Sequence, residues 1–237
     1  MFDDSQRRPT AGAAGPRTDR GQRMAEPRAN PYVWVTWLTK QLAGEDSCRW
    51  KLWFRANHTY DRVPGDFDLA RWTADHTQLL NAQADELRDQ GYAVYLEGQN
   101  EFRLRGANGA TLAGKADIVA IGPHDAVVID CKTGKERNSD KLQVLLYMLA
   151  LPLTAVHCRG RQLRGEVRYR DDGVGVAASS VDDEFRAMVK DAMDLAAAPS
   201  APPRTPSASE CRYCDVTAAD CHDRIDEPAA VTDTERF

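Results

Sequence analysis

The sequence lacks any run of about 18 apolar residues, so we expect no membrane-spanning helix. The arginines near the N-terminus are not followed by an apolar segment, which argues against a secretory signal and favours a cytoplasmic protein. The phosphate-binding pattern G-x-x-x-x-G-K-[ST] is also missing. Any ATP-driven unwinding would therefore require a partner protein.

An excess of positive charge is missing as well, because the net charge is −5. This argues against a protein that coats nucleic acid through bulk charge, but it allows a local basic groove beside an acidic metal site. Lysine and arginine do cluster locally, within residues 49–55, 132–141 and 159–168. Any one of these clusters, taken alone, is more typical of a solvated surface.

The length of 237 residues suits one sizeable domain with appendages. Residues 1–30 have no apolar periodicity and are predicted to form a disordered tail. Residues 31–197 carry the patterns of a folded core with N-terminal helices. A Pro/Ser linker at 198–210 then leads to a Cys-rich segment and tail at 211–237.

Apolar periodicity and turn residues predict an α/β fold, in which helices precede a mixed sheet that is crossed by a further helix. Helices are expected near residues 32–38, 48–58, 66–90, 141–151 and 180–197, the last one capped by Ser180 with Asp183. Strands are expected at 92–96, 101–105, 113–121, 126–132, 153–158, 163–169 and 175–179.

The most informative stretch covers residues 114–135. Asp117 opens one apolar strand, and Asp130 and Lys132 close the next. Because side chains alternate along a strand, those of Asp130 and Lys132 lie on the same face. A tight turn at Gly122–Pro123 would pair the strands as a hairpin and bring Asp117 close to Asp130.

Two carboxylates on an apolar scaffold repel each other and stay ionised most readily with a cation between them. Oxygen ligands favour Mg²⁺ or Mn²⁺. A lysine beside such a metal can orient water and stabilise charge on a phosphate. An Asp-x-Lys triplet alone, however, is a weak signal and is more typical of a surface salt bridge at a strand end.

The wider pattern resembles the PD-(D/E)xK nuclease superfamily, and within it the RecB-like exonucleases. Asp117 matches the first acidic position, and the triplet Asp130-Cys131-Lys132 matches the second motif, with Asp in place of the commoner Glu. The resemblance implies a restriction-endonuclease-like core, a mixed sheet flanked by helices. It also implies metal binding by Asp117 and Asp130 and catalysis by Lys132.

Two further positions match RecB-like motifs. Gln143 and Tyr147 fit a Gln-x-x-x-Tyr motif, and their spacing of four puts them on one stripe of a helix, where Gln143 can reach the site or a DNA strand. His76, on the earlier long helix, takes the place of a metal-binding histidine. A lone helical histidine is otherwise more often an exposed or capped residue, and Gln143 alone suits a polar helix edge.

Cysteine is the other informative residue, with six in the chain. In a cytosolic protein they are expected to be thiols or metal ligands rather than disulfides. Cys211 and Cys214 have C-x-x-C spacing and Cys221 follows, so a closed site needs a fourth ligand. The candidates for it are Cys48, His222, Cys158 and Cys131.

The arrangement resembles iron–sulfur RecB-like nucleases, which include AddB-type and CRISPR-associated adaptation nucleases and use one upstream and three downstream cysteines. The resemblance implies a [4Fe–4S] cluster that staples the C-terminal segment to the N-terminal helices. Zn²⁺ in the same four cysteines is the alternative. The proposed ligands are Cys48, Cys211, Cys214 and Cys221, whereas Cys131 and Cys158 are expected to be buried and apolar.

Together these features predict a metal-dependent DNA exonuclease that hydrolyses phosphodiester bonds at single-stranded or duplex ends. A helicase or a recombination or integration protein would be its partner, and no membrane is involved. A non-catalytic DNA-binding or interaction module on the same fold is one alternative, and a zinc-stabilised RNA-processing nuclease is another.

Overall fold

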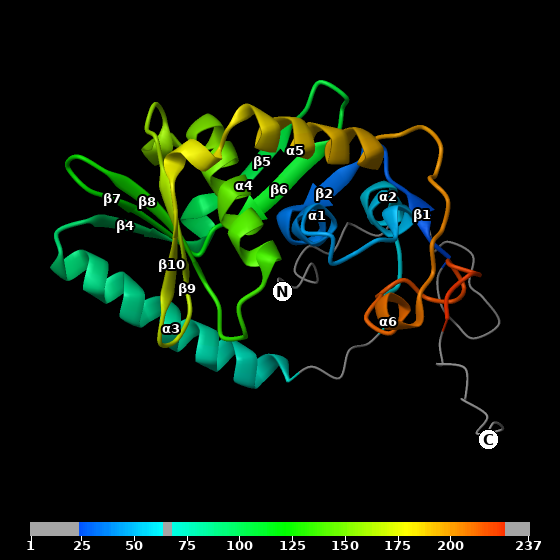
Figure 1. Cartoon of the computed structure of the whole chain (residues 1–237), viewed down its shortest axis with the longest axis horizontal. Helices are drawn as coiled ribbons and strands as arrows, with labels where there is room; N and C mark the ends of the chain where they lie inside the picture. The colour runs from blue at the N-terminus through cyan, green and yellow to red at the C-terminus, as the bar shows by residue number, and fades with distance from the viewer. Residues whose placement is uncertain (1–23, 64–67, 226–237) are drawn as a thin grey trace, which may run out of the picture.

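The computed structural model describes residues 24–63 and 68–225, in which a five-stranded and a three-stranded sheet lie among helices (Figure 1). The strand orders are β10-β9-β8-β7-β4 and β2-β6-β5, and a small third sheet pairs β1 with β3. The strands are β1 (Glu26–Pro27), β2 (Tyr32–Trp34), β3 (His58–Thr59), β4 (Ala93–Leu96), β5 (Glu101–Arg105), β6 (Thr111–Lys115), β7 (Ile118–Ile121), β8 (Ala126–Cys131), β9 (Arg164–Arg168) and β10 (Gly173–Val176). The helices are α1 (Val35–Leu42), α2 (Arg49–Asn57), α3 (Leu69–Asp89), α4 (Asn138–Thr154), α5 (Asp183–Ala196) and α6 (Ala208–Cys211).

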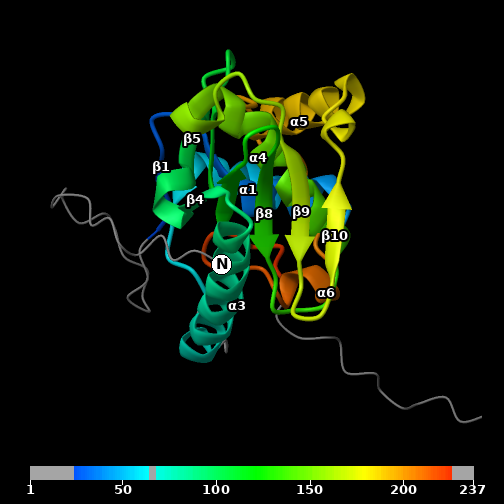
Figure 2. The same cartoon turned by 90° about the vertical axis from the view of Figure 1, so that its left-hand side faces the viewer.

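The five-stranded sheet is covered on both faces, by α3 on one side and α4 on the other. Every residue of β8 is buried, which explains why this strand reads as a continuous apolar run rather than an alternating one. Its residues Val127 and Ile129 pack with Leu80 of α3, whereas Val128 belongs to the cluster that contains α4. Figure 2 shows α3 lying across one face of this sheet. The strand ends thus lie between two helices that supply further side chains.

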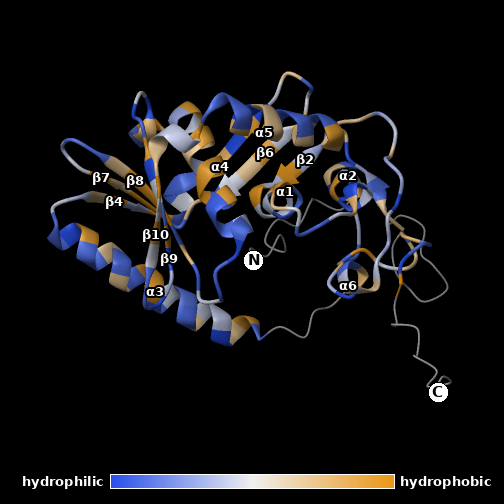
Figure 3. Cartoon of the chain, viewed as in Figure 1, coloured by the Kyte–Doolittle hydropathy of each residue, from blue (hydrophilic) through white to orange (hydrophobic). Residues whose placement is uncertain are grey.

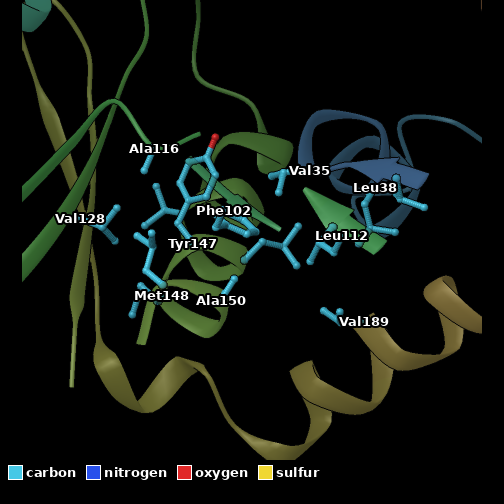
Figure 4. Packing of buried hydrophobic residues seen from close by; sticks show 14 of the residues in the cluster. Val35, Leu38, Phe102, Leu112, Ala116, Val128, Tyr147, Met148, Ala150 and Val189 are labelled. Atoms are coloured by element: carbon cyan, nitrogen blue, oxygen red, sulfur yellow. The ribbon is translucent and has the colours of Figure 1, made fainter. Parts of the chain in front are cut away.

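Helix α4 packs closely on the sheet and contributes six buried residues to the largest hydrophobic cluster of the described residues. Figure 3 shows hydrophobic segments along this helix. Gly165 in β9 permits this approach, since a Cβ atom there would lie 2.6 Å from the sulfur of Met148 and also collide with Val144. Tyr147 is 1% exposed, and its ring lies beside Phe102 of β5 with a centroid distance of 6.1 Å (Figure 4). The helix that carries the Gln-x-x-x-Tyr motif is therefore fixed by packing.

The mixed α/β architecture with several sheets agrees with the predicted fold class, but three predicted elements differ. Residues 113–121 are not one strand, because the chain leaves the three-stranded sheet after β6 and enters the five-stranded sheet at β7. At this crossover the carbonyl oxygens of Ala116 and Asp117 accept hydrogen bonds from Asn100 Nδ2 and Glu97 N. The apolar pattern continues from β6 into β7, so the sequence gives no sign of the break between the two strands.

The predicted strand at 153–158 is wrong, because α4 continues to Thr154 and a 3₁₀ turn follows at Val156–Cys158. The predicted helix near residue 32 begins only at Val35, since residues 32–34 form β2 and pair in parallel with β6. The cap of α5 is Asp182 rather than Ser180, and its Oδ1 accepts a hydrogen bond of 2.8 Å from Phe185 N.

The predicted N-terminal tail lies outside the described residues up to position 23, and the final segment does so from position 226. Within the described part of the chain, no helix is both long and apolar enough to cross a lipid bilayer.

Candidate active site

The two acidic positions meet at the open end of the β7–β8 hairpin. Ile118 of β7 pairs with Ile129 of β8, so Asp117 and Asp130 come one step further along the two strands and lie side by side. Both carboxylates are buried, with 3% and 1% of their residue surfaces exposed. Lys132 follows directly after β8, and its backbone N–H donates to Arg168 O at 2.8 Å. The hairpin thus brings the three residues of the predicted motif together.

The carboxylate of Asp117 connects the sheet to α3. Its Oδ2 accepts a hydrogen bond of 2.8 Å from Cys131 N and lies 3.2 Å from His76 Nε2. The imidazole ring of His76 stacks on the indole of Trp72 with a centroid distance of 4.9 Å and an interplanar angle of 21°. His76 is therefore a buried residue held in the site, not an exposed residue of the helix surface.

The carboxylate of Asp130 connects the sheet to α4. Its Oδ1 accepts a hydrogen bond of 2.9 Å from Gln143 Nε2, and its Oδ2 lies 2.6 Å from Lys132 Nζ. The same ammonium donates to Gln143 Oε1 at 3.0 Å. Gln143 Nε2 also donates to Tyr147 Oη, which in turn donates to Lys115 O at 3.0 Å. A continuous polar chain therefore runs from Asp130 to the end of β6.

Burial sets the electrostatics of this site. It raises the pKa of the Asp130 carboxyl to about 6, with a further rise from the charge of Asp117, against the opposing effect of Lys132. The pKa of Lys132 is raised, because the charges of Asp130 and Asp117 outweigh the opposing effect of burial. For His76 too, the hydrogen bond and charge of Asp117 outweigh burial and raise the pKa. Burial thus outweighs the neighbouring charges for Asp130, whereas the neighbouring charges outweigh burial for Lys132 and His76.

The donor set suits a hard divalent cation. Asp130 Oδ2 is buried and accepts no hydrogen bond of good geometry, so its ion pair with Lys132 leaves coordinating capacity unused. Carboxylate oxygens with one imidazole nitrogen suit Mg²⁺ or Mn²⁺. As the side chains stand, no three His, Cys, Asp or Glu residues in the described ranges are grouped to hold a metal ion. Binding therefore requires a shift of these side chains away from their present partners.

Four cysteines lie around one cavity between α2 and the C-terminal segment. Cys48 lines it from the N-terminal end of α2, together with Cys211, Cys214 and Cys221. The other candidates for a fourth ligand lie elsewhere: Cys131 packs against α3, Cys158 lies in the α4 cluster, and His222 is exposed and does not line the cavity. The four thiols named from the sequence therefore line one cavity, although in the described part of the chain they are not grouped closely enough to hold a metal ion as they stand.

Hydrogen bonds hold these chain segments together independently of any metal. Glu210, next to Cys211, accepts hydrogen bonds from the backbone N–H groups of Ser47 and Cys48 at 2.8 and 3.1 Å. Asp215 accepts from Arg55 Nε at 2.9 Å and from Tyr60 Oη at 3.1 Å. The C-terminal segment is therefore held against α2 and its flanking residues by its own acidic side chains. Figure 1 shows α6 lying beside α2.

Two neighbours of the site were not predicted from the sequence. Trp72 precedes His76 by four residues, a helical spacing that places two rings on one stripe and would have indicated their contact. Lys115 contributes its backbone carbonyl oxygen to Tyr147. No sequence signal marks that role, because any residue supplies a carbonyl group.

Comparison with known proteins identifies the arrangement. A sequence model of the PD-(D/E)XK nuclease superfamily matches residues 26–219. No protein of curated function matches the chain. Among solved structures, the chain is similar to the crystal structure of SSO0001, with 15% identity and a TM-score of 0.45 over 80% of this chain and 85% of that one.

Proposed function

Because the chain belongs to the PD-(D/E)XK nuclease superfamily, we propose that it is a metal-dependent DNA nuclease that acts as an exonuclease on single-stranded ends. Proteins of this superfamily are largely nucleases and typically use Mg²⁺ or Mn²⁺. The observation that carries the proposal is the meeting of Asp117, Asp130 and Lys132 at one end of a buried hairpin. Two neighbouring carboxylates in such an apolar setting are stabilised by a cation between them, and Lys132 supplies only one positive charge at Asp130.

The proposed metal ligands are His76, Asp117 and Asp130. Each comes from a different element, and packing on both faces of the sheet fixes their positions. When bound, the metal supplies Lewis acidity to the phosphate and lowers the pKa of water. Trp72 holds the imidazole plane of His76 through stacking, whereas the carboxylates would have to turn from their present partners to meet the metal.

Lys132 is proposed as the catalytic ammonium. Its Nζ carries a positive charge next to the carboxylates and donates hydrogen bonds, so it can orient the attacking water and stabilise the negative charge that develops on the phosphate. Gln143 positions this ammonium because its Oε1 accepts a hydrogen bond from Lys132 Nζ. It positions Asp130 because its Nε2 donates a hydrogen bond to that carboxylate. Tyr147 orients the Gln143 amide in turn.

We further propose that Cys48, Cys211, Cys214 and Cys221 bind a [4Fe–4S] cluster, with Zn²⁺ as the alternative. All four line one cavity between segments far apart in the chain. Arg204 and Lys51 line it too, and cationic neighbours offset the negative charge that thiolate ligands bring to a metal site. Glu210 and Asp215 already hold the C-terminal segment against α2 through hydrogen bonds, and the cluster would add covalent bonds between the same segments.

The experiment that tests the function is a cleavage assay on end-labelled single-stranded DNA, duplex DNA and RNA, offered side by side with Mg²⁺ or Mn²⁺. We expect single-stranded DNA to be degraded from an end and RNA to be left intact. Binding without cleavage under either metal would favour a non-catalytic DNA-binding module. Preferential cleavage of RNA would favour an RNA-processing nuclease.

A further inference from the structure

A small pocket lies next to the active site, between the start of α1 and the end of β6, and we call it the Trp34 pocket. We infer that it binds the base of an unpaired nucleotide in the DNA strand being cleaved. The inference rests on the proposed nuclease function and gives a physical reason for a single-strand preference. The residues that carry the argument are Trp34, Trp37, Arg62, Lys115 and Tyr147.

Two side chains, Tyr147 and Gln143, link the pocket to the carboxylate of Asp130. Tyr147 lines the pocket, and its hydroxyl accepts a hydrogen bond of 2.8 Å from Gln143 Nε2. Gln143 donates to Asp130 directly. Lys115 also lines the pocket, its carbonyl oxygen accepts a hydrogen bond of 3.0 Å from Tyr147 Oη, and it precedes Asp117 by two residues. A nucleotide in this pocket would therefore be a near neighbour of a phosphate at the active site.

The lining has the chemistry that an unpaired nucleotide requires. Trp34 ends β2 with its indole half-buried, which leaves part of an aromatic surface exposed. The guanidinium of Arg62 lies 5.8 Å from the ring centroid of Trp37, and its side chain is 38% exposed. Lys115 adds a second cation. Both cations have an acidic neighbour, since Lys115 Nζ lies 3.3 Å from Glu97 Oε1. Arg62 Nε lies 3.6 Å from Asp215 Oδ2, and neither acid lines the pocket. The first turn of α1 carries no acidic residue. Aromatic faces stack bases of any sequence, and cations beside them attract the phosphate backbone.

The size of the pocket decides how the base is held. The cavity has a volume of about 360 Å³ when the part open to solvent is included. Its enclosed part has room for about two water molecules and not for a base. The base would therefore lie at the mouth, with one face against the indole of Trp34. In a duplex both faces of an internal base are already stacked, so such a base cannot bind in this way, whereas a nucleotide in a single strand can present one face to the indole.

The packing that shapes the pocket also limits which variants are informative. Gly114 lines it, and a Cβ atom there would lie 2.7 Å from Val35 Cγ2 and 2.8 Å from Phe102 Cζ. Any larger residue at position 114 would disturb the core as well as the pocket. Trp34 is a better target, because it is half-buried at the strand end and not among the core residues.

The first test measures binding without cleavage, in the Lys132→Ala background with Mg²⁺. The probe is a single-stranded oligonucleotide that carries one 2-aminopurine, a base whose fluorescence is quenched by stacking. We expect quenching on binding, and loss of that quenching in Lys132→Ala/Trp34→Leu together with a Kd about 10-fold higher. Tyr213→Leu in the same background is the matched control, because Tyr213 is an aromatic residue that is 77% exposed and outside the pocket.

The second test uses the wild-type protein and so does not depend on how a variant folds. Single abasic sites are moved along a single-stranded substrate, and we expect cleavage to slow only when the missing base neighbours the scissile phosphate. The pocket assignment would be wrong if no abasic position slowed cleavage, or if Trp34→Leu left the quenching unchanged. Neither result would contradict the nuclease function. A wild-type protein that cleaves no DNA but shows Trp34-dependent quenching would overturn the nuclease function instead.

Discussion

The ammonium of Lys132 lies 2.6 Å from Oδ2 of Asp130. Gln143 closes a ring around this ion pair, since its carbonyl oxygen accepts from Lys132 and its amide nitrogen donates to the other oxygen of Asp130. In such a buried network each group satisfies its neighbours, and removal of one leaves another without its partner. The roles of the three residues can nevertheless be separated, because only one of them is a cation.

The first prediction concerns that cation. Lys132→Ala should reduce cleavage of single-stranded DNA by at least about 100-fold, because the charge that stabilises the transition state is lost. DNA binding, measured by fluorescence anisotropy, should change little, since one lysine contributes only a small part of the phosphate contacts. Lys141→Ala is the matched control, because the Lys141 side chain is 44% exposed and pairs with Glu136 rather than with a residue of the site. Wild-type cleavage by Lys132→Ala would contradict the proposed role.

The second prediction concerns the metal ligands. Asp117→Ala and Asp130→Ala should each abolish activity with Mg²⁺ and with Mn²⁺, because each variant removes an anionic oxygen ligand. His76→Ala should lower activity with Mg²⁺ and recover part of it with Mn²⁺, which tolerates looser coordination. Asp85→Ala, on the exposed side of the same helix as His76, should retain full activity. A fully active His76→Ala under both metals would leave His76 with a structural role only.

The active-site pattern was readable from the sequence because the hairpin is local. Asp117 and Asp130 are separated by one tight turn, and strand alternation fixes which side chains share a face. The helical spacing of Gln143 and Tyr147 is equally local, and both residues do reach the site. Patterns of this kind depend on backbone geometry alone, which the sequence determines over short distances.

What the sequence could not provide was the assignment of strands to sheets. The break between β6 and β7 depends on Asn100 and Glu97, which bond to the backbone at that point from an earlier turn. The continuation of α4 to Thr154 likewise overrides an apolar run that suits a strand, and it does so even though Pro152 lies within the helix. Both outcomes are decided by tertiary contacts, which no local propensity contains.

The third prediction concerns pH and the metal-free protein. The raised pKa of Asp130 means that the folded state keeps a proton that the unfolded state loses, so stability falls as pH rises from about 4 to about 6. The raised pKa of His76 acts in the same direction, because its stabilising contribution is present below about 6.5 and is lost above its folded pKa. These two groups should therefore make the free energy of unfolding lower at pH 8 than at pH 5.5, as measured by urea unfolding in EDTA.

Asp130→Asn is the control for the pH dependence of stability. It removes the titrating carboxyl, so the free energy of unfolding should change less between pH 4 and pH 6. Mg²⁺ or Mn²⁺ should reverse the trend, because a cation that binds only the folded state adds stability and binds more tightly as the carboxyl ionises. The pH dependence of the wild type should be compared in EDTA and in excess metal. A slope that is unaffected by either Asp130→Asn or metal would assign the effect to other groups.

The fourth prediction concerns the hydroxyl at the end of the polar chain. Tyr147→Phe removes the donor to Lys115 O and one acceptor of Gln143 Nε2, so it should lower the free energy of unfolding by about 1–3 kcal/mol. Activity should fall only moderately, because Gln143 still bonds to Asp130 and Lys132. Gln143→Leu should have the larger effect on activity, since it breaks the ring around the ion pair. Equal loss of activity in both variants would mean that the hydroxyl itself contacts the substrate.

The last prediction concerns the cysteine cavity. Protein purified without oxygen should be brown and contain about four irons per chain if the four thiols bind a [4Fe–4S] cube. Cys48→Ala should lose colour and solubility together, because Cys48 and Glu210 are 162 residues apart in the chain and a cluster between these segments closes a long loop. Cys131→Ala and Cys158→Ala should keep their iron, since neither thiol lines the cavity.

A further variant separates the cluster from the docking of the segment. Glu210→Gln weakens the hydrogen bonds to Ser47 and Cys48 without removing a thiol, so it should lower stability while colour and iron content persist. Colourless protein with one zinc per chain would replace the cluster by a zinc site and leave the nuclease function untouched. If Cys48→Ala kept its metal while His222→Ala lost it, the ligands would all belong to the C-terminal segment, and the proposed link to α2 would consist of hydrogen bonds and ion pairs alone.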